Sequence, residues 1–356
     1  MQTLHFDARF IRIDQHDGIS RFSAELAKAL STKVHLVAII HDLRQLDFLP
    51  RSIDYVVVNN PQSPKELFIA SKLNRLGAIH VFSPMQLMGS VGRKYKLILT
   101  LHDLIYYRHR KPPQSLNLFV RIIWRLYHLS YQPQRWLLNR ADAIATVSNT
   151  TKLLMEKHHL TRKPITVVYN APDKVQGVTS SAPESKNLIY IGSFMPYKNV
   201  ETLVRGAGLL PGYTLHLLSK ISKDRKGALE KLANSANASV VFHDGVTDKE
   251  YRDLLRTAFV LVSASKDEGF GIPLVEAMQI GTPVVVSDLD IFSEVAGEAG
   301  TFFNPDSPEG FAKAIVSLED SVTWASKASQ SISQAAKFDW DKSTDALLTA
   351  FKNLDS

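Results

Sequence analysis

The sequence predicts an α/β protein made of two doubly wound domains that face each other across a cleft. Short apolar runs rich in β-branched residues alternate with helical patterns along most of the 356 residues, as in parallel sheets covered on both faces. A polar stretch over 171–186 interrupts this alternation near the middle of the chain. The length also suits two domains of about 150 residues each.

The first half of the chain, 1–170, contains apolar runs of the length expected for buried strands. Before them, Ile19–Leu30 places Phe22 and Leu26 on one face of an expected helix. The expected strands are Val34–Ile40, Ile53–Val58, Ala78–Phe82, Leu97–Leu101, Ala143–Val147 and Ile165–Tyr169.

The stretch 171–186, APDKVQGVTSSAPESK, has no periodicity, so we expect it to be an interdomain linker. A second alternation of strands and helices fills 187–337, the second expected domain. Its expected strands are Leu188–Ile191, Thr214–Leu218, Ser239–Phe242, Phe259–Ser263, Pro283–Ser287 and Gly300–Phe303. Doubly wound sheets bind ligands at the carboxyl ends of their strands, so functional residues are expected in the loops that follow them.

Composition excludes several kinds of chemistry. The chain has no cysteine, which rules out disulfides, thiolate metal sites and cysteine nucleophiles. Its net charge of +7 favours anionic partners: nucleotides, phospholipid surfaces or nucleic acid. No run of apolar residues is long enough for a transmembrane helix, and the N-terminus lacks the pattern of a signal peptide. We therefore expect a cytoplasmic protein.

Two glutamates, Glu268 and Glu276, lie in a segment otherwise dominated by glycine, proline and apolar residues. Glu268 falls in the loop after the strand Phe259–Ser263. Pro273 suits the start of the next helix, which puts Glu276 in its expected first turn. Carboxylates at this edge can accept hydrogen bonds from sugar hydroxyls. The alternative is structural: Glu276 as a helix-dipole partner and Glu268 as a solvated loop residue.

The sequence around these glutamates favours a functional role for them over a structural one. EGFGIPLVEAMQIGTPVV resembles the signature of the retaining glycosyltransferases of family 4, whose GT-B fold has two Rossmann-like domains. The resemblance implies that Glu268 contacts the transferred sugar and that Glu276 binds the ribose hydroxyls of a nucleotide. The backbone amides of Gly269, Phe270 and Gly271 are then expected near the sugar.

Two further segments resemble the donor side of this family. YIGSFMPYKNVETLV resembles its phosphate segment, in which Lys198 at a helix start would neutralise a diphosphate. The family's usual arginine is missing, since its two alternative positions hold Ser193 and Tyr197. Lys198 with backbone amides, or another cation such as Lys266 or Arg21, would compensate. FHDGVTDKEYRDLLRTA resembles the base-binding turn and implies backbone contacts around Val246.

The first half also resembles family 4, in a branch rich in mannosyltransferases. FDARFIRIDQHDGISRF resembles its opening, where a Gly-Ile-Gly-Arg-Tyr loop closes over the donor. Gly18 and Ile19 match that loop, and Ser20 replaces its second glycine. LILTLHDLIYYRH resembles the family's acceptor-side strand and places His102 directly after it. The resemblance implies that this histidine hydrogen-bonds the transferred sugar. The alternative is that His102 has only a structural role. A C-terminal helix over 338–356 is expected to pack back on the first domain.

This resemblance implies a retaining transfer of a hexose, with mannose the best guess, from a GDP- or UDP-linked sugar. The acceptor would be a hydroxyl of a glycan or glycolipid, as in polysaccharide biosynthesis. No cofactor and no metal are expected. Asp288 and Asp290 form an Asp-x-Asp pattern, which holds a divalent metal in other glycosyltransferases. Here the pattern follows a strand of the second domain, where family 4 commonly has a loop without a metal site. The alternatives are a GT-B sugar-nucleotide epimerase or hydrolase, and a basic nucleic-acid-binding protein, which the dispersed basic residues disfavour.

One segment stands apart from this scheme. Tyr106–Arg140 contains seven lysines and arginines and no acidic residue, and its centre, LNLFVRIIWRLYHLSY, is rich in aromatic and aliphatic side chains. Such a composition is typical of a helix that lies in a membrane interface. It predicts peripheral contact with the inner membrane face. The alternative is a long, mostly buried helix with basic ends.

Overall fold

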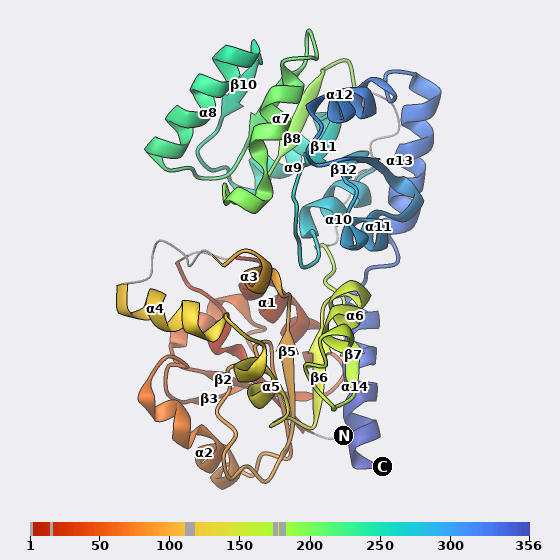
Figure 1. Ribbon diagram of the computed structural model, residues 1–356. Coiled ribbons are helices and arrows are strands. Elements are labelled where there is room, and N and C mark those ends of the chain that lie inside the picture. Colours follow the sequence, from red (N-terminus) through yellow and green to blue (C-terminus); the bar gives the residue numbers. More distant parts are fainter. Residues whose placement is uncertain (1–2, 15–16, 111–117, 174–176, 178–182) are drawn as a thin grey trace. The chain divides into compact units, whose positions relative to one another are not determined.

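The structure, a computed structural model, describes residues 3–14, 17–110, 118–173, 177 and 183–356. The chain divides into two compact units (Figure 1). Unit 1 comprises Met1–Asn170 together with Asp339–Ser356, and unit 2 comprises Ala171–Phe338. The expected linker over 171–186 falls at the start of unit 2, and its residues 174–176 and 178–182 lie outside the described part of the chain.

The described residues of unit 1 form a seven-stranded sheet in the order β3-β2-β1-β4-β5-β6-β7, and every pairing in it is parallel. In β5, every residue from Leu97 to Leu101 is buried. Because successive side chains of a strand point to opposite faces, the sheet is covered on both sides. The strands are β1 (Thr3–Asp7), β2 (His35–Ile40), β3 (Asp54–Val57), β4 (His80–Ser83), β5 (Lys96–Leu101), β6 (Ala143–Thr146) and β7 (Ile165–Val167).

Strand β1 was not among the strands predicted from the sequence, although it lies in the sheet between β2 and β4. Its sequence, TLHFD, alternates polar and apolar residues and lacks the continuous apolar run by which the other strands were predicted. His5 is 6% exposed and Asp7 is fully buried. Arg9 and Ser83 donate hydrogen bonds to the buried Asp7 carboxylate. His5 Nδ1, in contrast, has no hydrogen-bond partner among the described residues.

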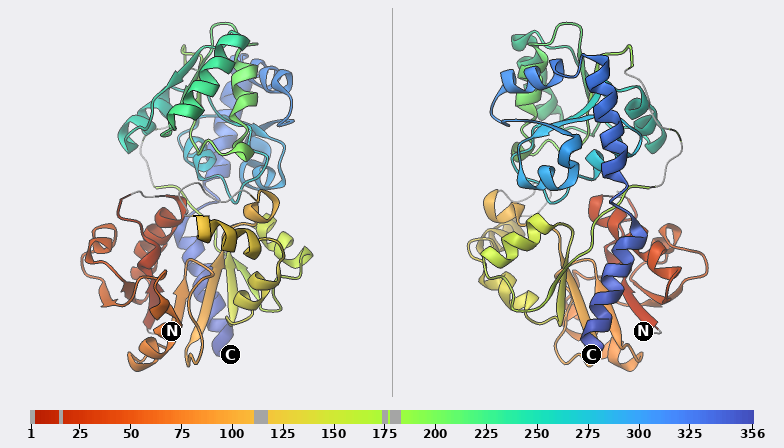
Figure 2. Two further views of the ribbon diagram at one scale, coloured as in Figure 1. Left: turned by 60° about the vertical axis from the view of Figure 1, so that its left-hand side comes forward. Right: turned by 90° about the vertical axis from the view of Figure 1, so that its right-hand side faces the viewer.

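The helices of unit 1 pack on both faces of its sheet. The long helix α14 contacts α1 and strands β5, β6 and β7, so the end of the chain completes unit 1 (Figures 1 and 2). The helices are α1 (Gly18–Ser31), α2 (Ile69–Arg75), α3 (Ile105–Arg108), α4 (Leu118–Tyr127), α5 (Gln132–Leu138), α6 (Asn149–Lys157) and α14 (Trp340–Asp355), with 3-10 turns at Ala8–Phe10, Leu43–Phe48 and Pro64–Phe68.

The described residues of unit 2 form a six-stranded sheet in the order β10-β9-β8-β11-β12-β13, again with parallel pairings. Strands β8 and β11 are neighbours at its centre, which decides where the following loops meet. The strands are β8 (Asn187–Tyr190), β9 (Thr214–Leu217), β10 (Val240–Phe242), β11 (Val260–Ser263), β12 (Val284–Ser287) and β13 (Gly300–Phe303).

The helices of unit 2 enclose a core built around Trp324, which is fully buried and donates a hydrogen bond from Nε1 to the Phe259 carbonyl at 2.8 Å. The helices are α7 (Val200–Ala207), α8 (Lys223–Ala236), α9 (Asp248–Thr257), α10 (Ile272–Gln279), α11 (Asp290–Ala296), α12 (Pro308–Val316) and α13 (Ser321–Ala335), with 3-10 turns at Pro196–Lys198 and Gly297–Ala299. No helix in the described ranges combines the length and apolar character needed to cross a membrane.

Replacing either of two helical glycines of unit 2 by alanine should change the free energy of unfolding, in opposite directions. A Cβ on Gly206 of α7 would lie 2.4 Å from Phe311 Cδ1 and 2.9 Å from the Pro308 carbonyl oxygen, whereas a Cβ on Gly227 of α8 meets nothing within 4 Å. We expect Gly227→Ala to raise the free energy of unfolding by about 0.5–1 kcal/mol. Gly206→Ala should lower it by about 1–3 kcal/mol because α7 and α12 must separate.

Urea unfolding followed by tryptophan fluorescence measures both changes. Equal stabilisation by the two alanines would contradict the close packing of α7 against α12.

Candidate active site

The two residues expected to act on the sugar and the diphosphate meet in unit 2. Lys198 Nζ forms an ion pair with Glu268 Oε1, and each side chain is 15% exposed. They are 70 positions apart in the sequence. They meet because Lys198 follows β8 and Glu268 follows β11, and these strands are adjacent in the sheet. Ser265 Oγ also donates a hydrogen bond to Glu268 Oε1, at 3.0 Å.

The loops that carry this pair are tied together by their backbones. The Lys266 amide donates to the Tyr197 carbonyl at 2.7 Å, which fixes the loop after β11 against the loop after β8. The Lys266 side chain, one candidate for the missing phosphate cation, forms an ion pair with Asp306 at an exposed position. Arg21, the other candidate, belongs to unit 1. Lys198 is therefore the cation that the structure places beside Glu268.

Glu276 lies one residue further into its helix than the sequence predicts, which puts it just beyond the first turn. Helix α10 begins at Ile272, so Pro273 is its second residue and Glu276 its fifth, in the second turn. The prediction of the first turn was wrong because Gly271, not Ile272, caps the helix, with φ 95° in the left-handed region. Dipole stabilisation is confined to the first turn, so this position weakens the interpretation of Glu276 as a dipole partner.

A neighbouring helix orients the Glu276 carboxylate. Tyr251 on α9 is 7% exposed, and its hydroxyl donates to Glu276 Oε2 at 2.9 Å. Sequence analysis did not identify Tyr251 or Ser265 as site residues. Tyr251 lies within the segment that resembles the base-binding turn, and Ser265 lies three residues before Glu268, but neither resemblance assigns these side chains a role. Each contacts a glutamate because α9, β11 and α10 converge at one edge of the sheet.

The other expected donor residues lie in loops at the same edge. The Tyr190 hydroxyl donates to the Ser193 carbonyl at 2.6 Å, and the Gly192 amide donates to Ser219 Oγ at 3.0 Å. Val246 follows a turn in which Asp244 and Gly245 both have positive φ. The Gly269–Gly271 turn is anchored by Phe270, which is 4% exposed and packs edge-on against Phe338. In these turns Ser193 is exposed and Val246 is half-buried.

In unit 1 the segment compared with a donor-covering loop is instead helical. Gly18 is the first residue of α1, and Asp17 caps the helix by accepting from the Ser20 amide at 2.9 Å. Ser20 is fully buried, and its hydroxyl accepts from the Arg12 amide at 2.8 Å. The serine that replaces the family's glycine therefore fixes the entry to α1 and holds Gly18 and Ile19 in its first turn.

His102 lies directly after β5, as expected. Its Nε2 is 2.8 Å from the Pro84 carbonyl oxygen, which can only accept, so Nε2 carries the proton and donates. Burial lowers the pKa of His102 to about 4. The imidazole is therefore neutral near pH 7, with Nδ1 as a hydrogen-bond acceptor, and the Phe22 ring lies edge-on to it at 5.1 Å.

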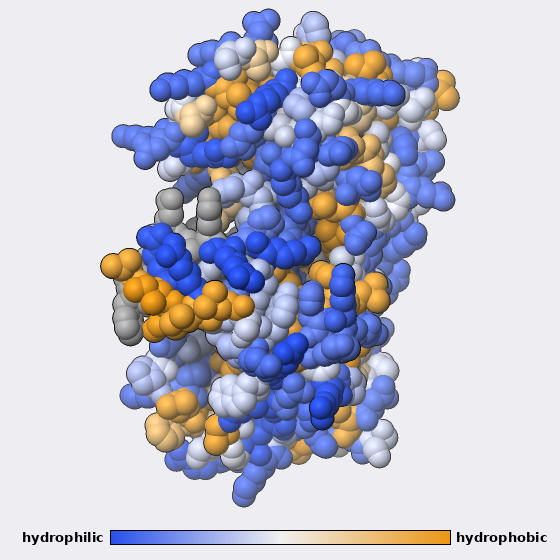
Figure 3. Space-filling model, in the orientation of Figure 1, coloured by the Kyte–Doolittle hydropathy of each residue, from blue (hydrophilic) through white to orange (hydrophobic). Residues whose placement is uncertain are grey.

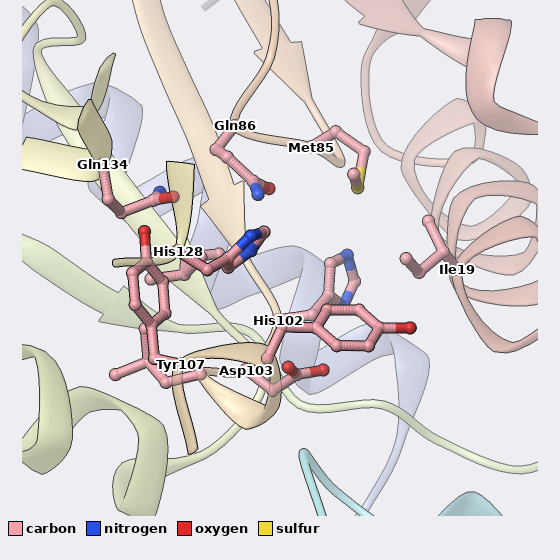
Figure 4. Close-up of a pocket in the computed structure, with 11 residues that line it drawn as sticks. Ile19, Met85, Gln86, His102, Asp103, Tyr107, His128 and Gln134 are labelled. Carbon is pink, nitrogen blue, oxygen red and sulfur yellow. The ribbon is translucent and has the colours of Figure 1, made fainter. Parts of the chain in front are cut away.

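His102 and Ile19, which the sequence singled out separately, share one cavity of about 120 Å³ in unit 1 (Figure 4). The polar side chains that line it also include Gln86, Asp103, His128 and Gln134, which sequence analysis did not identify. Gln86 and His128 point toward one another across it. The histidine and the second glutamine come from the basic segment, so composition alone gave them no catalytic signal.

The Asp-x-Asp pattern does not gather metal ligands. Asp288 is exposed, and Asp290 is the first residue of α11. Across the ranges that the structure describes, no group of three or more His, Cys, Asp or Glu side chains could hold a metal ion.

Comparison with known proteins covers both units. The model of Glycosyltransferase Family 4 matches residues 16–174, and the model of Glycosyl transferases group 1 matches residues 185–321. The O-antigen chain mannosyltransferase RfbU of Salmonella typhimurium is 25% identical over 338 residues, which are 91% of this chain and 92% of that protein. The O-antigen chain mannosyltransferase B of Escherichia coli is 25% identical over 386 residues, with 95% and 96% coverage.

Solved structures share the fold. A sucrose-phosphate synthase from Thermosynechococcus elongatus superposes with a TM-score of 0.76 at 17% identity, covering 99% of each chain. Anabaena HepE in complex with UDP and glucose gives a TM-score of 0.74 at 18% identity, covering 99% of this chain and 100% of that one. With two parallel-sheet units and glycosyltransferase models matching in both, the chain belongs to glycosyltransferase family 4 and has the GT-B fold.

Proposed function

We propose that this glycosyltransferase moves a hexose, mannose first among candidates, from a GDP- or UDP-linked sugar to a hydroxyl of a glycan or glycolipid, with retention of anomeric configuration. The observation that carries the proposal is the Lys198–Glu268 pair at the carboxyl edge of unit 2. A cation that could neutralise a diphosphate lies beside a carboxylate that could accept a hydrogen bond from a sugar, and this supports the proposal. The mannosyltransferase names of the two O-antigen relatives support the choice of mannose.

Unit 2 would hold the donor through groups of complementary charge. Glu276, oriented by Tyr251, would accept hydrogen bonds from the ribose hydroxyls. The base would lie against the backbone around Val246. Lys198, with the backbone around Ser193, would neutralise the diphosphate, and Glu268 with the Gly269–Gly271 turn would orient the sugar. A bound diphosphate would compete with Glu268 for Lys198, so donor binding would redirect both side chains.

The reaction would break the bond between the anomeric carbon and the diphosphate oxygen and form a bond from the acceptor oxygen on the same face. The leaving diphosphate oxygen would take the acceptor's proton. Lys198 would stabilise the charge that grows on the diphosphate, and Glu268 the positive charge on the sugar ring. Neutral His102 would accept a hydrogen bond from a sugar hydroxyl at Nδ1 rather than act as a cation.

We also propose that the enzyme acts at the cytoplasmic membrane face through α4. The segment 106–140 is not one long buried helix: its described part forms the separate helices α3, α4 and α5, while residues 111–117 lie outside the description. Apolar side chains of α4 and the turn after it point outward (Figure 3). These are Leu118, Ile122, Ile123, Leu126 and Leu129, which are 49–74% exposed. Arg121 and Arg125 would contact anionic lipid headgroups beside this face.

Substitutions of Glu276 and Glu268 should change different kinetic constants of the enzyme. Glu276→Ala removes contacts made equally in the ground and transition states, so donor KM and the Kd of the nucleotide diphosphate should rise. A hydrogen bond to a charged group contributes about 1.5–3 kcal/mol, or roughly 10- to 150-fold. Glu268→Gln should lower kcat while keeping or tightening nucleotide diphosphate binding, because Lys198 loses its intramolecular partner.

Steady-state kinetics and calorimetry with GDP and UDP separate these outcomes. Glu230→Gln, at a 50% exposed position on α8, is the matched control. Loss of nucleotide affinity in Glu268→Gln with none in Glu276→Ala would reverse the two assignments. Donor consumption that is equal with and without acceptor would favour a hydrolase.

Transfer should proceed without a divalent metal, because Lys198 provides positive charge for the diphosphate. EDTA should leave kcat within about twofold of the untreated enzyme, and Asp288→Ala should behave like the parent protein. Activity that EDTA abolishes and manganese restores would refute this.

Binding to vesicles containing phosphatidylglycerol should depend on both the apolar face and the charge of α4. Ile122→Ser/Leu126→Ser and Arg121→Glu/Arg125→Glu should each weaken co-sedimentation, the latter by at most about 2–4 kcal/mol. Added salt should also weaken it. Leu153→Ser, at a 64% exposed position on α6, is the control. Equal sedimentation of all four proteins would exclude α4 as the contact.

A further inference from the structure

A second cavity of unit 1, of about 690 Å³, lies apart from the groups proposed to act on the sugar and the diphosphate. It is bounded by the end of α5 and by the segment that joins α6 to β7 (Figure 1). Its lining residues precede β6 and β7, whereas His102 follows β5, so the two lie toward opposite edges of the parallel sheet. The lining consists of Arg135, Asn139, His159, Thr161 and Arg162.

Hydrogen bonds fix the shape of this cavity. Asn139 Oδ1 accepts from the Arg162 amide at 3.1 Å and from the Thr161 hydroxyl at 3.3 Å. Asn139 Nδ2 donates to the Arg135 carbonyl at 2.7 Å, so one side chain ties the end of α5 to the segment after α6. That segment bends at His159, whose φ of 48° lies in the left-handed region. The wall of the cavity is therefore preformed.

Arg135 is held in position by the end of α6. Its Nε donates to the His159 carbonyl at 3.0 Å, and its Nη2 donates to the His158 carbonyl at 2.8 Å. Carbonyls at a helix C-terminus attract cations, so these two contacts have a structural explanation. Arg135 Nη1 has no hydrogen-bond partner among the described residues. Because the guanidinium is already fixed, an anion that binds Nη1 would cost little further side-chain freedom.

No such structural contact accounts for the Arg162 side chain. It forms no hydrogen bond or ion pair with the part of the chain that the structure describes. In the same unit Arg9, Arg44 and Arg93 each pair with a carboxylate. The described lining of the cavity contains no carboxylate at all. Two guanidinium groups therefore share one cavity, and no acidic side chain of its lining compensates their charge.

The positive potential of this region also acts on a neighbouring histidine. Burial lowers the pKa of His158, and the positive charges of Lys157, Arg108 and Arg135 lower it further. Like charges repel, so an anion bound among these cations would be stabilised. Guanidinium groups form paired, charge-assisted hydrogen bonds with phosphate oxygens, and a phosphate group can carry nearly two negative charges. A phosphate group therefore matches both the charge and the donors of the cavity.

We propose that this cavity binds a phosphate group through the guanidinium groups of Arg135 and Arg162, with the His159 ring beside them. The site is separate from Lys198 of unit 2, and the inference does not depend on the proposed function. A soluble phosphate ester and a lipid headgroup both carry such a group. Trp136, next to Arg135 on α5, is 63% exposed, so a lipid surface is one of the two sources to be tested.

Calorimetry of the full chain with glycerol 3-phosphate and inorganic phosphate tests the site. Arg162→Gln should raise the Kd of both at least about tenfold, because it removes charge-assisted hydrogen bonds. The Tm should not change, since the side chain has no described partner to lose. His159→Asn is a second variant, because asparagine tolerates the left-handed conformation. It should raise Kd roughly 2- to 10-fold, the effect of one neutral hydrogen bond.

Two control variants locate the bound phosphate. Arg51→Gln makes the same charge change at an exposed position in the turn before β3, and it should leave Kd unchanged. Lys198→Ala, in unit 2, should also leave it unchanged. Equal effects of Arg51→Gln and Arg162→Gln would reduce the binding to general electrostatics and overturn the site. Binding that is lost in Lys198→Ala and retained in Arg162→Gln would move the phosphate to unit 2 and overturn it as well.

Co-sedimentation with phosphatidylcholine vesicles, with and without phosphatidylglycerol, distinguishes the two sources. It is measured in the Ile122→Ser/Leu126→Ser protein, which lessens any contribution of α4. Weaker binding to phosphatidylglycerol vesicles in Arg162→Gln than in Arg51→Gln would identify a lipid headgroup. An effect of Arg162→Gln on glycerol 3-phosphate alone would identify a soluble ester. If Arg162→Gln changes neither measurement, the cavity is not a phosphate site. Neither measurement uses transfer activity, so the result is independent of the proposed function.

Discussion

Parallel pairing of every strand in each sheet is the constraint on which this molecule depends. Because both faces of each sheet are covered, the strand backbones form hydrogen bonds with neighbouring strands and the strand side chains pack in the core. The carboxyl ends of all strands then meet at one edge of each sheet, where loops are free to carry chemistry. His102 follows β5, and Lys198 and Glu268 follow the adjacent strands β8 and β11. The Lys198–Glu268 pair is a direct consequence of that adjacency.

Charge divides the sites at the carboxyl edges of the two units by the ligands that they suit. Unit 2 presents a lysine and two glutamates, Glu268 and Glu276, each glutamate held by a neighbouring hydroxyl. The cavity beside His102 in unit 1 offers neutral imidazoles and amides among aromatic walls. The diphosphate and the sugar of a nucleotide sugar differ in the same way. The electrostatics of each site, considered alone, therefore agree with the contacts proposed for Lys198 and His102.

A buried ion-pair network keeps the loops of unit 1 in place. Arg9 is 3% exposed, and it donates to Asp7 at 2.7 Å through Nε and to Glu66 at 3.0 Å through Nη2. Burial would lower the pKa of Arg9, but the two carboxylates outweigh it and raise that pKa. Glu66 also accepts from the Gly89 amide at 3.1 Å, in the loop that presents Gln86 to the cavity. Removing one member would leave a buried charge without compensation, so this network holds the loop firmly.

The sequence by itself determined the two-domain α/β architecture, the family, and the positions of Glu268, Lys198 and His102, because these depend on local periodicity and on short motifs at strand ends. Only the tertiary structure decided which of these groups meet. It placed the polar strand β1 inside a sheet, where Ser83 donates to the buried Asp7 carboxylate and Glu66 pairs with Arg9. It moved Glu276 into the second turn of α10 against Tyr251, and it left Gln134 buried with a donor facing a cavity. Such contacts join segments far apart in the chain, and their free energy depends on burial and on partners that no local pattern specifies.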